Sequence, residues 1–176
     1  MKDCARARTP AASVKSLPYA NPRAIGMWGH SLGGGVTTRA MVVSPLIKAH
    51  VLYAPTSADV RVRRFTGGLA GATGTDDADL YDSYFYWTRN PQLVQELSPI
   101  NFFKYVTAPV QIHVGQIDRT TPPEWSQAIR DELKAQSKYV EYYEYPRQAH
   151  AFIGSGWTLF NQRVVAFFDR YLKTVR

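Results

Sequence analysis

The chain has 176 residues, of which 45% are hydrophobic and 20% are charged. This balance is ordinary for a soluble globular protein, and the length fits one domain with a substantial core. The net charge is +7, but the basic residues are scattered and form no basic helix or stripe that would follow a phosphate backbone. We therefore expect no nucleic-acid partner.

The sequence contains no apolar run of membrane-spanning length and no signal-peptide core near Met1. We therefore expect a cytoplasmic protein without a membrane partner. Its single cysteine, Cys4, excludes an intrachain disulfide. We also expect neither a cofactor nor a bound metal.

The first elements of the chain surround a glycine-rich motif. Residues 3–17 are interpreted as the frayed remainder of a helix. Residues 23–28 form a short apolar run typical of a buried strand, and residues 34–43 are typical of a packed helix. Between them lies a Gly-x-Ser-x-Gly motif at residues 29–33, with Ser31 at its centre. A strand, this motif and a helix in succession are the context of a nucleophile elbow.

Such an elbow is a turn so sharp that the backbone of the serine is strained. Glycine is expected at Gly29 and Gly33 because a Cβ atom would have no room there. The turn exposes the Ser31 hydroxyl at the carboxyl end of the strand and directs the backbone N–H of Leu32 at the position of an oxyanion. The alternative is a glycine-rich turn with an incidental serine.

The second predicted strand covers residues 47–54, and its continuous apolar run indicates burial on both faces. His50 lies within it and is interpreted as a packed or rim histidine rather than a catalytic one. Residues 55–104 lack clear periodicity and contain a glycine-rich stretch at 67–75 and an aromatic run at 81–87. This insertion is either a lid whose aromatic side chains line a substrate pocket or a helix that buries them against the domain.

Two further strands are predicted at residues 108–115 and 139–145, the second of them a tyrosine-rich edge strand. A helix begins at Pro122-Pro123 between these strands, and a closing helix carries two rows of apolar residues between Phe160 and Val175. Strands that alternate with helices predict an α/β fold with a mostly parallel sheet of about four strands, flanked by helices.

Polar residues that follow three of these strands form a candidate triad, Ser31, Asp118 and His150. Serine is a poor nucleophile unless a base takes its proton and a third group orients that base. The order Ser, Asp, His is the one expected after a nucleophile elbow. Asp131 is a poor alternative because it falls within a helix, and His113 because it falls within a strand.

The residues around these positions resemble the α/β-hydrolases of the prolyl oligopeptidase group, which comprises serine peptidases and esterase-like relatives. The resemblance covers about residues 20–175 and rests on motifs in the same order as in that group: residues 21–34, Gly115-x-x-Asp118 and Tyr145-Pro146-x-x-x-His150. It implies Ser31 as the nucleophile, Asp118 as the residue that orients the base and His150 as the base. It also implies dienelactone-hydrolase-like relatives, which use cysteine where this chain has Ser31.

Members of this group have further strands before the elbow, and a loop there carries the second oxyanion donor. Only 30 residues precede Ser31 here, and they contain no such motif. We therefore expect a single, amino-terminally truncated α/β-hydrolase domain over residues 1–176, with a lid-like insertion at about 55–104. The truncation would leave the 23–28 strand unpaired on one side, so self-association through that edge or aggregation is expected, unless residues 3–17 fold across it.

The expected function is that of a serine-type peptidase that cleaves a peptide or carboxylic ester bond through an acyl-enzyme on Ser31. Two alternatives stay open, a hydrolase of small esters and a non-catalytic fragment with an incomplete oxyanion hole. One missing oxyanion donor costs roughly 3–4 kcal/mol of transition-state stabilisation, so an intact triad is compatible with poor activity.

Overall fold

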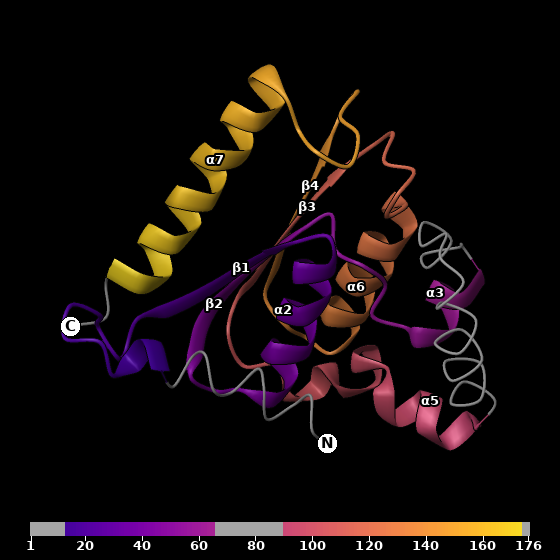
Figure 1. Cartoon of the computed structure of the whole chain (residues 1–176), viewed down its shortest axis with the longest axis horizontal. Coiled ribbons are helices and arrows are strands. Elements are labelled where there is room, and N and C mark those ends of the chain that lie inside the picture. The colour runs from indigo at the N-terminus through magenta and orange to yellow at the C-terminus, as the bar shows by residue number, and fades with distance from the viewer. Residues whose placement is uncertain (1–12, 66–89, 174–176) are drawn as a thin grey trace, which may run out of the picture.

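The structure is a computed structural model that describes residues 13–65 and 90–173. A four-stranded parallel sheet forms the centre of the described chain, in the order β1-β2-β3-β4 (Figure 1). The strands are β1 (Ile25–His30), β2 (Ile47–Tyr53), β3 (Val110–Gly115) and β4 (Val140–Tyr145). The α/β fold with a parallel sheet that the sequence predicts is therefore confirmed, as is the position of β4 at a sheet edge.

Helices cover both faces of this sheet. In Figure 1, α2 and α6 lie on one face and α7 lies on the other. The helices of the described chain are α2 (Leu32–Val43), α3 (Val60–Phe65), α5 (Pro91–Leu97), α6 (Pro123–Ala135) and α7 (Gly154–Phe168), with a 3₁₀ helix η1 (Pro99–Tyr105) and a π-helical turn η2 (Asp169–Lys173).

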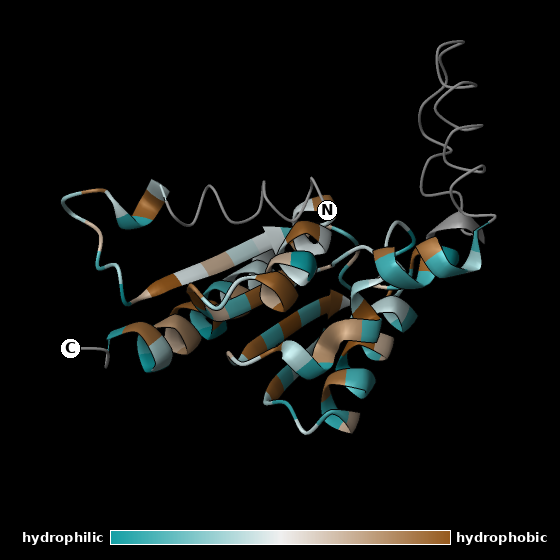
Figure 2. Ribbon diagram, turned by 90° about the horizontal axis from the view of Figure 1, so that it is seen from below, coloured by the Kyte–Doolittle hydropathy of each residue, from teal (hydrophilic) through white to brown (hydrophobic). Residues whose placement is uncertain are grey.

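The core lies on both faces of the central strands. Leu52 of β2 and Ile112 of β3 are fully buried in a cluster beneath α2 and α6, whereas Val51 is buried against Phe167 of α7. Each such side chain contributes about 1.5–3 kcal/mol to folding when it is fully buried. Figure 2 shows hydrophobic stretches along the strands and mixed faces on the helices. The two-sided burial expected for β2 is present, as a parallel sheet covered on both faces requires.

The boundaries of the first strand differ from the prediction. β1 starts and ends two residues later than the expected 23–28. At its start, the backbone N–H of Arg23 donates to the Asn21 side chain (3.0 Å) and that of Ala24 to the Asn21 carbonyl (3.1 Å), so a turn occupies these residues. At its end, pairing with β2 continues to His30, opposite Tyr53. Likewise α2 begins earlier than the expected residue 34.

Part of the sequence-based interpretation falls outside the described residues. This holds for the glycine-rich stretch at 67–75 and the aromatic run at 81–87, so neither interpretation of the insertion is tested. Of residues 3–17, the structure describes 13–17, and residues 13–15 are helical. The truncated single domain stays a prediction. Across 13–65 and 90–173, no helix has the length and apolar character needed to cross a membrane.

The register of the sheet brings the loops after the strands together. His30 lies opposite Tyr53, Tyr53 opposite His113, and Gly115 opposite Tyr145. β1 and β2 therefore end opposite each other, and β3 and β4 end together two residues further on. The segments that follow them, which contain the three candidate residues, meet at this carboxyl edge of the sheet.

Candidate active site

Ser31 joins β1 directly to α2 in a strained backbone conformation. Its φ is 56° and its ψ is −118°, in a region that side-chain-bearing residues rarely adopt and that costs about 1–3 kcal/mol. Backbone hydrogen bonds hold it there. The Ser31 N–H donates to the Tyr53 carbonyl (2.9 Å), and the Ser31 carbonyl accepts from the N–H groups of Gly35 (3.1 Å) and Thr56 (3.2 Å). The strained turn expected of a nucleophile elbow is therefore present.

The glycines around Ser31 differ in whether there is room for a Cβ atom. A Cβ atom on Gly29 would lie 2.1 Å from the carbonyl oxygen of Gly33, so only glycine fits there. A Cβ atom on Gly33 would have no atom within 4 Å, and the steric requirement expected at that position is wrong. The close approach occurs one residue later, where a Cβ atom on Gly34 would lie 2.8 Å from Cα of Pro55.

Asp118 lies after β3 in a turn that its own carboxylate stabilises. Its Oδ1 accepts from the backbone N–H groups of Thr120 (2.8 Å) and Thr121 (2.9 Å). Its Oδ2 is 2.8 Å from the Thr121 hydroxyl and 2.9 Å from Nδ1 of His150. The side chain is buried, with 3% of the residue exposed. Such a carboxylate, held by several donors, has one fixed orientation.

His150 lies on the loop between β4 and α7. Because the Asp118 carboxylate only accepts, Nδ1 of His150 carries the proton in this pair and Nε2 is left as the basic nitrogen. The His150 carbonyl accepts from Nε2 of His30 at 2.9 Å, and the two rings lie 4.6 Å apart. Two residues on, the N–H of Phe152 donates to the Tyr53 hydroxyl. The loop is therefore tied to the ends of β1 and β2.

The structure brings Asp118 and His150 into contact, and Ser31 directly follows His30, which contacts His150. Among the described residues, no hydrogen bond joins the Ser31 hydroxyl to His150. Such bonds are often long in free enzymes and shorten when substrate binds. Leu32 is the first residue of α2, and a helix amino terminus leaves its first N–H groups free for an anion.

The other histidines and the aspartate considered for the triad, His50, His113 and Asp131, lie in different environments. His50 is buried within β2, and burial lowers its pKa to about 3. His113 is buried within β3, with Nδ1 at 2.8 Å from the Tyr145 hydroxyl, and burial is the main cause of the lowering of its pKa to about 3. Asp131 lies on α6 and pairs with Arg130 at 2.7 Å. The interpretation of His50 as a packed histidine is confirmed.

Sequence reasoning missed two residues of the site, His30 and Thr121. His30 is the variable position before the serine, and its partner is 120 residues away in the sequence. The Thr121 hydroxyl lies within hydrogen-bond distance of both Asp118 and His150. Neither residue type is demanded by the motif that contains it, so no sequence signal pointed to them.

A cavity of about 520 Å³ opens beside this edge of the sheet. Its walls come from the segment after β2, from η1 and from the start of α6, and include Ser57, Val62, Ile100, Trp125 and Ile129. The lining is mostly apolar. Its lining residues Ser57 and Pro122 are next in sequence to Thr56, whose N–H binds the Ser31 carbonyl, and to Thr121.

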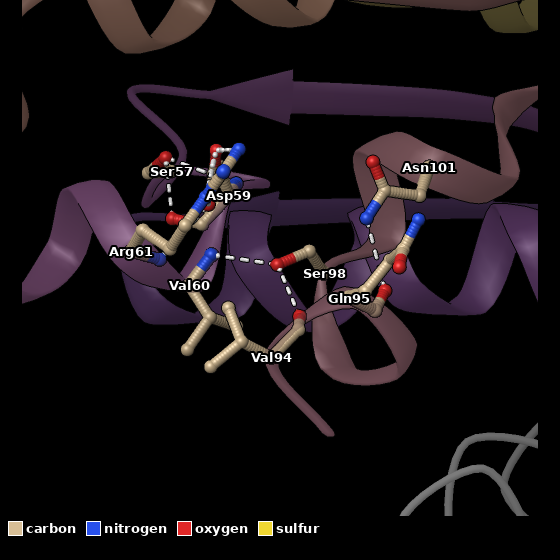
Figure 3. Close-up of polar contacts among 8 residues, drawn as sticks. All are labelled: Ser57, Asp59, Val60, Arg61, Val94, Gln95, Ser98 and Asn101. Carbon is tan, nitrogen blue, oxygen red and sulfur yellow. Dashed lines mark hydrogen bonds and ion pairs between the residues drawn. The ribbon is translucent and has the colours of Figure 1, made fainter. Parts of the chain in front are cut away.

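Figure 3 shows polar contacts around Ser57 and Asp59, two of the residues that line this cavity. The Ser98 hydroxyl accepts from the backbone N–H of Val60 (3.1 Å) and donates to the carbonyl of Val94 (2.8 Å), which joins the start of α3 to the end of α5. The Asp59 carboxylate pairs with Arg61 at 2.7 Å, and this contact is the main cause of its lowered pKa. Within the described chain, no cluster of three or more His, Cys, Asp or Glu residues is placed to hold a metal ion.

Residues 1–175 match the model of the prolyl oligopeptidase family. The chain belongs to this family. The resemblance inferred from the sequence is thus confirmed, and the family match covers the elbow, the Asp118 turn and the His150 loop.

Solved structures similar to this family member have the same α/β-hydrolase fold. Acylaminoacyl peptidase from Pyrococcus horikoshii is 24% identical with a TM-score of 0.74, over 94% of this chain and 26% of that one. Dipeptidyl peptidase 4 from Porphyromonas gingivalis is 20% identical with a TM-score of 0.77, over 97% and 23%. Acetyl xylan esterase 1 from a Thermoanaerobacterium species is 18% identical with a TM-score of 0.67, over 94% and 51%. This family member therefore spans about a quarter of the two peptidases and about half of the esterase.

Proposed function

We propose that the chain carries the catalytic residues of a serine hydrolase, most simply a serine-type peptidase, and cleaves its substrate through an acyl-enzyme on Ser31. The observation that carries the proposal is the hydrogen bond between buried Asp118 and Nδ1 of His150, beside a serine held in an elbow conformation. Membership of the prolyl oligopeptidase family supports it.

In the proposed reaction, Nε2 of His150 takes the hydroxyl proton of Ser31 while Oγ attacks the carbonyl carbon of the substrate. Asp118 stays ionised and stabilises the imidazolium. The Leu32 N–H donates to the oxyanion of the tetrahedral intermediate. The intermediate collapses when the leaving group takes the proton from Nε2, and water, activated by the same nitrogen, then releases the acyl group and restores Ser31.

The mostly apolar cavity lined by residues after β2 and at the start of α6 is proposed to receive a side chain of a peptide substrate. A second candidate function is the hydrolysis of a small ester, and it is favoured by the likeness to an acetyl xylan esterase that covers 94% of this chain. The third hypothesis is a non-catalytic chain with one oxyanion donor, and it predicts an ordered triad that hydrolyses no substrate. The cytoplasmic location inferred from the sequence stays a prediction.

The test compares peptide p-nitroanilides that carry an apolar residue before the scissile bond with p-nitrophenyl acetate. We expect the wild-type protein to hydrolyse at least one of them, with a rate that falls at acidic pH as His150 is protonated. Ser31→Ala should lower kcat by about 10⁴-fold or more. The exposed serine Ser155 offers the matched control, because Ser155→Ala removes an exposed hydroxyl that is not part of the candidate triad. Equal activity in wild type and Ser31→Ala would contradict the proposal, and cleavage of the acetate alone would favour the esterase.

A further inference from the structure

The hydroxyl of Thr121 touches three separate parts of the site. Its Oγ1 is 2.8 Å from Oδ2 of Asp118, 3.1 Å from Nδ1 of His150 and 3.0 Å from the carbonyl oxygen of Ala54. Thr121 is buried, with 2% of the residue exposed. A single buried hydroxyl therefore links the carboxylate, the imidazole and the end of β2.

The direction of each hydrogen bond follows from which atoms can donate. The carboxylate and the Ala54 carbonyl only accept, and the Nδ1 proton of His150 points to Asp118. The hydroxyl has one proton and two possible acceptors, and an ionised oxygen forms the stronger bond. The shorter of the two contacts is also the one to Asp118. The Thr121 hydroxyl therefore donates to Oδ2, the same oxygen that accepts from His150.

Ala54 is itself held in an unusual conformation that supports this arrangement. Its φ is 42°, and its backbone N–H donates to the His113 carbonyl at 2.7 Å. This left-handed turn directly after β2 leaves the Ala54 carbonyl within reach of Thr121. The turn costs strain that an alanine rarely bears, so the surrounding contacts must hold it.

We propose that Thr121 is a positioning residue for the Asp118–His150 pair. By donating to Oδ2, its hydroxyl fixes the carboxylate in line with Nδ1 and takes up part of the negative charge that would otherwise act on the imidazolium. The catalytic consequence of this role rests on the proposed function, whereas the effect on the imidazole itself does not. Other titratable groups beside His150 are His30, whose ring is 4.6 Å away, and Tyr53, stacked on His30 at 4.2 Å.

The test uses Thr121→Val, which keeps the shape of the side chain and removes the hydroxyl, and Thr121→Ser, which keeps the hydroxyl. Without the donor, the carboxylate acts more strongly on the imidazolium, so protonation of His150 becomes easier. In Thr121→Val we expect the acidic limb of the pH–rate profile to move to higher pH. We expect kcat to fall about tenfold with KM unchanged, since one hydrogen bond to a charged group is lost. Thr121→Ser should behave like the wild type.

A second measurement is independent of turnover. In protein labelled with ¹⁵N-histidine, the NMR titration midpoint of the His150 ring should move to higher pH in Thr121→Val and stay in place in Thr121→Ser. If the wild type hydrolyses nothing, the proposed function fails while this titration still decides the role of Thr121. Thr121→Ala serves the same comparison if Thr121→Val does not fold, and Thr158→Val, on the exposed side of α7, is the control for loss of a threonine hydroxyl elsewhere.

Three results would overturn the proposal. An unchanged midpoint in folded Thr121→Val would show that the hydroxyl does not act on His150. A midpoint moved to lower pH would show that the hydroxyl accepts from Nδ1 instead of donating to Asp118. An equal shift in Thr121→Ser would show that packing, rather than the hydroxyl, is responsible. If Thr121→Val lowers the melting temperature but shifts neither the pH–rate profile nor the His150 titration midpoint, Thr121 has a structural role only.

Discussion

Ser31 and Ala54 both adopt left-handed backbone conformations directly after neighbouring strands, with φ values of 56° and 42°. Ser31 is followed directly by α2, and Ala54 by an irregular segment. Strain of this kind persists only where the surroundings hold it, and it is often found at functional sites. Here the hydrogen bonds that hold both residues also join the ends of β1, β2 and β3.

The residues that the sequence could predict are those whose local motif demands them. Ser31 follows from the elbow pattern, and Gly29 follows from sterics that the structure bears out. The steric requirement predicted for Gly33 is absent, because the direction of α2 leaves open space beside its Cα. His30 and Thr121 were missed because their partners come from other strands, and only the folded sheet brings them together.

At the residue scale, the two buried histidines predict acid sensitivity. Burial lowers the pKa of His50 and of His113 to about 3, whereas an unfolded histidine titrates near 6.5. The unfolded chain therefore binds more protons between these values, so the free energy of unfolding is at its full value above pH 6.5 and falls as the pH drops toward 3. Each histidine contributes a slope of up to about 1.4 kcal/mol per pH unit.

The variant His50→Leu isolates the contribution of His50 to this pH dependence. It removes the ionisable ring without breaking a hydrogen bond at Nδ1, because that atom has no hydrogen-bond partner among the described residues. Urea unfolding followed by circular dichroism between pH 8 and pH 4 should show a shallower loss of stability in the variant than in the wild type. The same pH dependence in both proteins would show that His50 is protonated in the folded state.

At the element scale, the sequence located the strands but not their ends. The apolar run at residues 23–28 marked β1, yet the strand extends to His30 because its backbone pairs with β2 up to Tyr53. Pairing partners are not visible in one sequence, so boundaries shift while the order of elements holds. The contact that matters most for the site, between the end of β3 and the His150 loop, is likewise a contact between elements.

Gly115 makes that contact possible. A Cβ atom there would lie 2.2 Å from the carbonyl oxygen of Gln148 and 2.4 Å from that of Ala149. Gly115→Ala should therefore push the His150 loop away from Asp118. We expect a loss of about 1–3 kcal/mol in stability and a fall of about 100-fold in kcat. Thermal unfolding and steady-state kinetics measure both quantities.

The contrasting variant is Gly33→Ala, whose Cβ atom would meet nothing within 4 Å. It lies in α2, where alanine is favoured over glycine by about 1 kcal/mol, so its stability should equal or exceed that of the wild type. If Gly115→Ala were as stable and as active as the wild type, the loop would not depend on close approach to β3.

At the scale of the whole molecule, β1 is one of the two edge strands of the described sheet, the other being β4. It pairs with β2 on one side, and no described strand pairs with its other side. Trp28 on this strand is 46% exposed, although its composition suggested an interior position. A free strand edge with an exposed aromatic residue readily recruits another chain.

We therefore predict that the 176-residue chain self-associates through β1. Size-exclusion chromatography with light scattering should give a mass above the 19.8 kDa of one chain. Trp28→Lys, which places a charge on the edge, should shift the protein toward the monomer. A wild-type protein that stays monomeric at high concentration would show that this edge is covered.

Covalent labelling tests most directly whether Ser31 is an activated nucleophile. The folded protein should react with a fluorophosphonate, and peptide mass spectrometry should place the adduct on Ser31. Labelling should vanish in Ser31→Ala, persist in Ser155→Ala and slow strongly when His150 is replaced by alanine, since the hydroxyl then lacks its base. An adduct on another residue, or labelling that survives in Ser31→Ala, would contradict the account. A folded wild-type protein that remains unlabelled would show that this elbow carries no active serine.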